Sequence, residues 1–206
     1  LARTQRSKSE VLVNSDRPEE AVKVASDALA TMEKIRSVLP AETVSYWRAL
    51  TFSYWRRAYA HYSTGNPELA IEDYKNALSL AARRIALDPD DEDARQGHAT
   101  YSGEIVYPLI DLKRYQEAEQ SLLAATKWFE DRYQRDPDRG AYQRSMLVQH
   151  VQLHELYYNW SGHEVQRCHE LYEIKRFADI MEAAGTMLES DRPEIAAYLE
   201  QHPLCT

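Results

Sequence analysis

The sequence predicts an all-α protein built from stacked antiparallel helix pairs, and three observations support this fold class. Only 6 glycines and 8 prolines occur in 206 residues, too few for an all-β protein that turns about every ten residues. A pattern of prolines and alanines recurs about every 48 residues. Between these markers, apolar residues follow helical spacing, and hydrophobic residues make up 44% of the chain.

Two independent sets of markers define the repeat. Loop prolines recur at steps of 49 and 48 residues, at Pro40, Pro89 and Pro137. Alanines near predicted helix starts recur at the same two steps, at Ala21, Ala70 and Ala118. Because both sets share one period, the chain is predicted to consist of structural repeats of 48 to 49 residues.

Each marker alanine lies in a predicted outer helix with one apolar face. In the first of these helices the face consists of Ala21, Ala25, Ala28, Leu29 and Met32. Outer helices are expected over residues 17–38, from Pro67, from Arg114 and over 163–184. Asp16, Asn66 and Asp191 precede or open such segments, and their side chains can accept hydrogen bonds from the exposed N–H groups of a helix start.

The intervening segments, 41–63, 91–111 and 139–160, are predicted to form the inner helices. Residues 41–63 carry apolar residues on two sides, as expected for a helix packed between neighbours. Pro108 falls late in the second inner helix, where its ring removes a backbone hydrogen bond. We therefore expect a kink or an early stop at Pro108.

The predicted layout has three parts. Residues 1–15 form a flexible or truncated N-terminal segment, 16–188 a helical repeat domain, and 189–206 a short C-terminal helix and tail. The first outer helix lacks a full inner partner, so the chain is expected to be a piece of a larger protein. No signal-peptide pattern follows Leu1, and the compartment is not indicated.

The stretch from Phe52 to Pro89 resembles a tetratricopeptide repeat (TPR). Its first helix ends in a glycine turn at Gly65, and the small, aromatic, small and proline marker positions hold Ala70, Tyr74, Ala77 and Pro89. The usual TPR unit is about 34 residues long, so each helix here is expected to be about two turns longer. The resemblance implies a right-handed α-solenoid of antiparallel helix pairs, with about seven long helices plus a short C-terminal helix. The run from Leu78 to Ala94 also resembles a long TPR variant found in bacterial multidomain proteins, where such repeats often follow a kinase or regulatory domain.

TPR-like repeats line a concave groove with their inner helices and bind extended peptides or partner helices there. Projecting the second repeat forward proposes the groove residues, which are Arg48, Trp55, Arg56, Tyr59, Tyr62, Tyr107, Glu155 and Tyr158. Aromatic residues and arginine commonly anchor interfaces. The alternative is that these aromatics belong to the core, since one helix register away they would face a neighbouring helix.

His150 and His154 are the candidates for a metal site, because histidines four residues apart share a helix face and can chelate zinc or copper. Val151 stands where the metalloprotease signature requires glutamate, so that signature is absent. No glycine-rich phosphate loop or G-x-S-x-G turn occurs. We expect no catalytic residues and no cofactor.

The chain has a net charge of −8 and a pI of about 5.4, which argue against a nucleic-acid partner. No stretch of 18 apolar residues occurs, so membrane insertion is not expected. The predicted function is therefore that of a scaffold or sensor module that binds a protein or peptide, and not that of an enzyme. The alternative is an oligomerisation or spacer domain that forms a homodimer.

Overall fold

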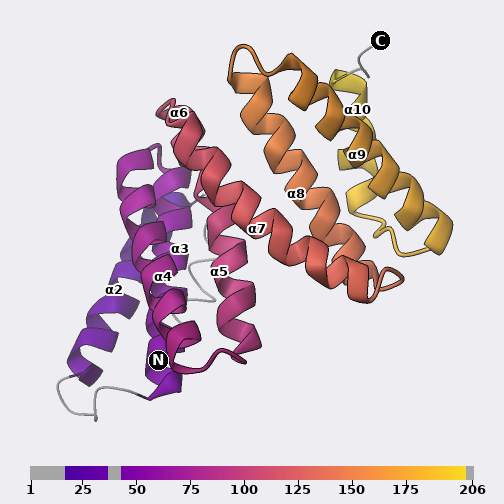
Figure 1. Ribbon diagram of the computed structural model, residues 1–206. Helices are drawn as coiled ribbons and strands as arrows, with labels where there is room; N and C mark the ends of the chain where they lie inside the picture. The colour runs from indigo at the N-terminus through magenta and orange to yellow at the C-terminus, as the bar shows by residue number, and fades with distance from the viewer. Residues whose placement is uncertain (1–16, 37–42, 203–206) are drawn as a thin grey trace. The chain divides into compact units, whose positions relative to one another are not determined.

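The computed structural model describes residues 17–36 and 43–202, and all regular secondary structure within these ranges is helical (Figure 1). The helices are α2 (Pro18–Arg36), α3 (Val44–Ser63), α4 (Pro67–Leu87), α5 (Glu92–Glu104), α6 (Val106–Asp111), α7 (Tyr115–Arg135), α8 (Gly140–Asn159), α9 (Glu164–Ala184) and α10 (Asp191–Gln201). The predicted cap Asp16, the segment 1–15 and Pro40 lie outside the described residues. The all-α fold class is confirmed, with long paired helices followed by the short α10. Within the described ranges, no helix has both the length and the apolar character needed to cross a membrane.

The chain divides into two compact units between Leu112 and Lys113. Unit 1 contains α2 to α6, and its successive long helices pack side by side. The marker Ala21 is completely buried and lies against Ala60 of α3, where a larger side chain would push the two helices apart. Farther along α2, Met32 packs against Tyr46 and Trp47 of α3. The predicted apolar face of α2 is therefore its buried face.

The turn between α3 and α4 is built around a glycine. Gly65 has φ +73°, its N–H donates to the carbonyl of Tyr62, and the N–H of Asn66 donates to the carbonyl of His61, both at 2.9 Å. These two bonds close the end of α3 as a Schellman motif. The side-chain amide of Asn66 donates to the carbonyl of Thr64 at 3.0 Å and makes no cap bond to α4. The prediction that the Asn66 side chain caps α4 is therefore wrong, because that side chain belongs to the preceding turn.

The second inner helix is interrupted as its proline predicts. Helix α5 ends at Glu104, Ile105 separates the two segments with φ −60° and ψ −17°, and α6 begins at Val106. Pro108 has no N–H to donate to the carbonyl of Glu104 four residues earlier. The helix does not stop at Pro108 itself: it is interrupted at Ile105, three residues earlier, and resumes as α6, which contains Pro108 and ends at Asp111.

Unit 2 contains α7 to α10. Helix α8 packs against both α7 and α9, and its buried residues lie on more than one side. The centre of the unit includes Leu156 of α8 with Ile174, Phe177 and Met181 of α9, all fully buried.

The start of α10 differs from its prediction. Asp191 is the first residue of the helix, Ser190 occupies the cap position, and no side-chain cap bond is made. The Asp191 carboxylate instead accepts two hydrogen bonds from Arg144 of α8. The predicted helix is present, but the predicted role of Asp191 as its cap is wrong, because Arg144 binds that carboxylate.

Candidate functional site

Unit 1 places a set of aromatic residues where α3 meets α5 and α6. The Trp55 ring lies 5.5 Å from the Tyr101 ring, measured between centroids, and Tyr62 stacks on Tyr107 at 6.4 Å with an interplanar angle of 27°. Trp55, Tyr62 and Tyr107 are each half-buried, as is Tyr59, which lies one turn after Trp55 on α3. We call the set Trp55, Tyr59, Tyr62, Tyr101, Glu104 and Tyr107 the α3–α5 cluster.

The carboxylate of Glu104 fixes the polar ends of two aromatic side chains. Its Oε2 accepts a 2.5 Å hydrogen bond from the Trp55 indole N–H and a 3.2 Å bond from the Tyr74 hydroxyl. Burial raises the pKa of Glu104, although the bonds from Trp55 and Tyr74 and the charge of Arg56 act in the opposite direction. Because its donors come from α3 and α4, Glu104 holds α5 to both helices.

Tyr62 has a similar anchor at the other end of the cluster. Burial, together with the nearby Asp111 carboxylate that accepts its hydrogen bond, raises the pKa of Tyr62 to about 12. The Tyr62 hydroxyl is therefore protonated at neutral pH. Two rings of α3 are thus oriented by carboxylates from the next inner helix, which limits their rotation.

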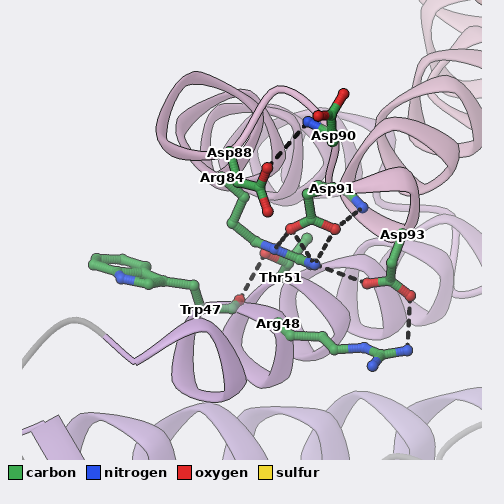
Figure 2. Close-up of polar contacts among 9 residues, drawn as sticks. Trp47, Arg48, Thr51, Arg84, Asp88, Asp90, Asp91 and Asp93 are labelled. Atoms are coloured by element: carbon green, nitrogen blue, oxygen red, sulfur yellow. Dashed lines mark hydrogen bonds and ion pairs between the residues drawn. The ribbon is translucent and has the colours of Figure 1, made fainter.

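The two arginines assigned to the groove have different surroundings. The Arg56 guanidinium lies over the Trp55 ring, 4.1 Å from its centroid, which is a cation–π geometry. Arg48 is exposed and donates to Asp93 at 2.7 Å (Figure 2). Arg56 therefore extends the aromatic surface, whereas Arg48 belongs to a separate ionic network.

This network is centred on Arg84, a nearly fully buried side chain of α4 (Figure 2). Its guanidinium donates to both carboxylate oxygens of Asp91 at 2.8 to 3.0 Å and to Asp93 at 2.9 Å. Asp91 also accepts a 3.0 Å bond from the N–H of Ala94 and so caps α5. The network fixes the start of α5 against α3 and α4.

In unit 2 the two predicted groove residues lie against α10 and the residue that follows it. Glu155 Oε1 accepts a 2.8 Å hydrogen bond from the Tyr198 hydroxyl. The ring of Tyr158 lies 5.0 Å from that of His202, which follows α10, although 52% of Tyr158 is exposed. Glu155 and Tyr158 are therefore partly covered by the chain itself.

His150 and His154 lie one turn apart on α8 but contact different partners. His150 Nδ1 is 2.6 Å from Glu170 Oε2 of α9, and His154 Nδ1 is 2.6 Å from the Tyr198 hydroxyl. Burial lowers the pKa of His154 to about 4, with smaller contributions from His202 and Arg167. In the part of the chain that the structure describes, no three His, Cys, Asp or Glu side chains are grouped so that they could hold a metal ion.

One stretch of the chain matches a known protein family. Residues 53–84, which include most of α4 and the α3 side of the aromatic cluster, match the tetratricopeptide repeat family. The chain has a TPR-like fold.

Solved structures of similar fold cover nearly all of the TPR-like chain. The nearly identical TPR-like repeats assigned to a kinesin light chain of Podosopora anserina match with a TM-score of 0.55 and 16% identity, over 98% of this chain and 96% of that chain. A variant of the same repeats matches with a TM-score of 0.55 and 18% identity, over 97% of this chain and 91% of that chain. At these identities the similarity is one of fold. No curated protein sequence gives a significant match.

The sequence prediction missed three residues that organise the TPR-like helices, namely Glu104, Arg84 and Tyr198. Glu104 carried a usable signal, because it lies 49 residues after Trp55 and this is one repeat length. Arg84 and Tyr198 carried none, since a charged or hydroxyl-bearing residue in a helix is usually exposed. Their partners become evident only from the packing of the helices.

Proposed function

We propose that this TPR-like chain binds a peptide or a helix of another protein on the inner-helix surface of unit 1. The fold supports a protein–protein interaction role in general, since proteins built from such repeats bind partners on extended surfaces. The proposed contact residues are Arg48, Trp55, Arg56, Tyr59, Tyr62 and Tyr107. In this proposal the chain is a scaffold or sensor segment of a signalling or regulatory protein.

The observation that carries this proposal is the pair of half-buried aromatic residues held by carboxylates. Trp55 is held by Glu104 and Tyr62 by Asp111, while part of each ring is still accessible. A ring that is already oriented loses little entropy when a partner covers it. Rigid aromatic residues beside an arginine are a common composition of binding hot spots.

The test is a peptide library selected on the whole chain, followed by fluorescence-polarisation titration of the selected peptides. Tyr59→Ala is expected to weaken their binding at least tenfold, because it removes a half-buried ring next to Trp55. Leu87→Ala, at a position of α4 that is 68% exposed, is the control and is expected to leave binding unchanged. Peptides whose affinity is insensitive to both Tyr59→Ala and Tyr107→Ala would contradict the proposal.

A structural role, as a spacer or an oligomerisation element, is a second candidate. The contacts of Tyr198 with Glu155 and of His202 with Tyr158 favour it, because the chain itself covers part of the surface assigned to a partner in unit 2. Light scattering distinguishes this role from peptide binding. A stable dimer that is lost in Val165→Asp, at a residue of α9 that is 82% exposed, would support it.

A further inference from the structure

Helix α10 contacts α8 at two polar points that are about two turns apart along α10 and about three turns apart along α8. At the first, Asp191 accepts from Arg144 Nε at 2.6 Å and from Nη2 at 3.2 Å. At the second, seven positions later, the Tyr198 hydroxyl lies 2.8 Å from Glu155 and 2.6 Å from His154. Since the earlier residue of α10 meets the earlier residue of α8, the two helices run in the same direction.

The hydrogen bonds at the second point have a definite polarity. A tyrosine has one hydroxyl proton, and the Glu155 carboxylate can only accept, so the Tyr198 hydroxyl donates to Glu155. The same hydroxyl must then accept from the protonated Nδ1 of His154. The two neighbouring residues of α8 thus recognise one hydroxyl group both as a donor and as an acceptor.

Apart from these contacts, α10 is weakly held. Asp191 is its one buried residue, whereas Ile195 and Leu199 are only half-buried. Its ion pairs through Arg192 to Glu182 and Glu189 involve exposed side chains, which contribute little. A helix of 11 residues is also too short to be stable alone. The position of α10 therefore depends on Arg144, His154 and Glu155 together with its limited packing on α9.

The same type of contact joins two inner helices of unit 1. Arg48 near the start of α3 pairs with Asp93 near the start of α5, and α5 then buries Ala99 and Tyr101 along its length. Arg144 lies 96 residues after Arg48, which is two repeat lengths. Helix α10 thus takes the place of a next inner helix, but without the buried apolar residues that secure α5.

We infer that the surface formed by Arg144, His154 and Glu155 is a binding site for a partner helix carrying a carboxylate and, seven positions later, a tyrosine. Helix α10 is the exchangeable occupant of this site within the chain. Arg144 binds the carboxylate, and His154 and Glu155 together select tyrosine over phenylalanine. A partner helix of this pattern displaces α10 and binds in its place.

This inference is tested in the full chain with Asp191→Asn and Tyr198→Phe combined, which weakens α10 and leaves the α8 surface intact. The probe is a fluorescent peptide of residues 189–202 with the natural sequence. Because an attached helix competes at high effective concentration, weakening it raises the apparent affinity for a free one. We expect the peptide to bind the double variant at least tenfold more tightly than the wild-type chain, as measured by fluorescence polarisation.

Three controls test whether the gain in peptide affinity comes from the release of α10 and from the predicted contacts on α8. Glu200→Gln, at an exposed position of α10, is expected to behave as wild type. A peptide with phenylalanine at the position of Tyr198 is expected to bind the double variant about tenfold more weakly than the natural peptide. Adding Arg144→Ala to the double variant is expected to reduce the affinity for the natural peptide by a similar factor.

Hydrogen exchange and circular dichroism of the double variant verify that α10 is released while the other helices remain folded. If α10 exchanges faster but the peptide binds no better than to wild type, the inference is wrong. Equal binding of the tyrosine and phenylalanine peptides would also overturn it. Tyr59→Ala in unit 1 is expected to leave binding of this peptide unchanged, so failure here is distinct from failure of the proposed function.

Discussion

The two units join successive inner helices in different ways. In unit 1, α5 is held by Arg84, by the Arg48–Asp93 pair and by the half-buried Glu104. In unit 2, α10 is held by Arg144 and by the contacts of Tyr198 with Glu155 and His154. We call these two sets of contacts the α3–α5 junction and the α8–α10 junction.

The polarity of the contacts is partly reversed between the junctions. At α3–α5 the central carboxylate, Glu104, is on the later helix, whereas at α8–α10 it is Glu155 on the earlier helix. The outer helix contributes the buried cation Arg84 in unit 1, but the exposed anion Glu182 in unit 2. Polar contacts at both junctions include buried groups, such as Arg84 in unit 1 and Asp191 in unit 2. The difference lies in the apolar contribution, because α5 buries Ala94, Ala99 and Tyr101, whereas Asp191 is the one buried residue of α10.

The largest difference between the junctions is expected from Arg84→Met. This change leaves Asp91 and Asp93 without their main cation in a mostly buried place. Loss of one partner from a buried ion pair typically destabilises by several kcal/mol, so we expect the free energy of unfolding to fall by about 3 kcal/mol. Chemical denaturation measures it, and Arg192→Met, which breaks exposed pairs at the other junction, is the control. Equal losses for the two variants would remove the distinction between the junctions.

Trp55→Phe is expected to give the next largest effect. It keeps an aromatic ring but removes the shorter of the two hydrogen bonds to Glu104, with an expected loss of about 1.5 kcal/mol in the free energy of unfolding. Since that bond lowers the pKa of Glu104, its removal is expected to raise the pKa further. Carbon-detected NMR titration of Glu104 measures this shift. Trp128→Phe, which lies in unit 2, is the matched control and is expected to leave the Glu104 titration unchanged.

The repeat and the fold class could be predicted from the sequence because helix packing imposes a residue type at fixed positions. Ala21, Ala70 and Ala118 are all completely buried, and a larger side chain at any of them would separate two helices. The break near Pro108 was equally predictable, since proline lacks the N–H that a helix needs there. Both features follow from the residue type at a single position, which can be read from the sequence.

The site was less predictable because it depends on which helices meet. Apart from its spacing of one repeat length from Trp55, nothing in the sequence distinguishes Glu104 from an exposed glutamate in another helix. Glu155 was assigned to an open groove, and its contact with Tyr198 joins residues 43 positions apart. Asn66 shows the same limit at short range, because a helix cap and a turn residue carry the same side-chain chemistry.

A pH titration of His154 is expected to show a further difference between the two junctions. The pKa of His154 is lowered to about 4 from an ordinary value near 6.5, mainly by burial. The unfolded or undocked state therefore binds more protons between these values, so the contribution of neutral His154 is complete above about pH 6.5 and is lost as the pH falls toward 4. Protons on the His154 ring, followed by NMR, are expected to titrate near pH 4 in wild type and closer to pH 6.5 when Asp191→Asn and Tyr198→Phe release α10.

Residue-specific detection is needed because His61 and His98 in unit 1 also have pKa values lowered by burial. A global unfolding curve would combine all three histidines. An unchanged His154 titration in a variant whose α10 exchanges freely would show that α10 does not cover His154.

The smallest expected effect comes from Arg48→Ala, and it compares the two equivalent arginines directly. Arg48 is about half exposed, and its partner Asp93 keeps a second bond from Arg84, so we expect a loss below about 0.5 kcal/mol. Arg144→Ala is expected to be more costly, at about 1 kcal/mol, because Asp191 is largely buried and has no other cation in contact among the described ion pairs. Chemical denaturation gives both values, and hydrogen exchange shows whether the loss in Arg144→Ala is confined to α10. A larger loss for Arg48→Ala than for Arg144→Ala would contradict this expectation. The exposed Arg48–Asp93 pair would then hold α5 more strongly than the Arg144–Asp191 pair holds α10.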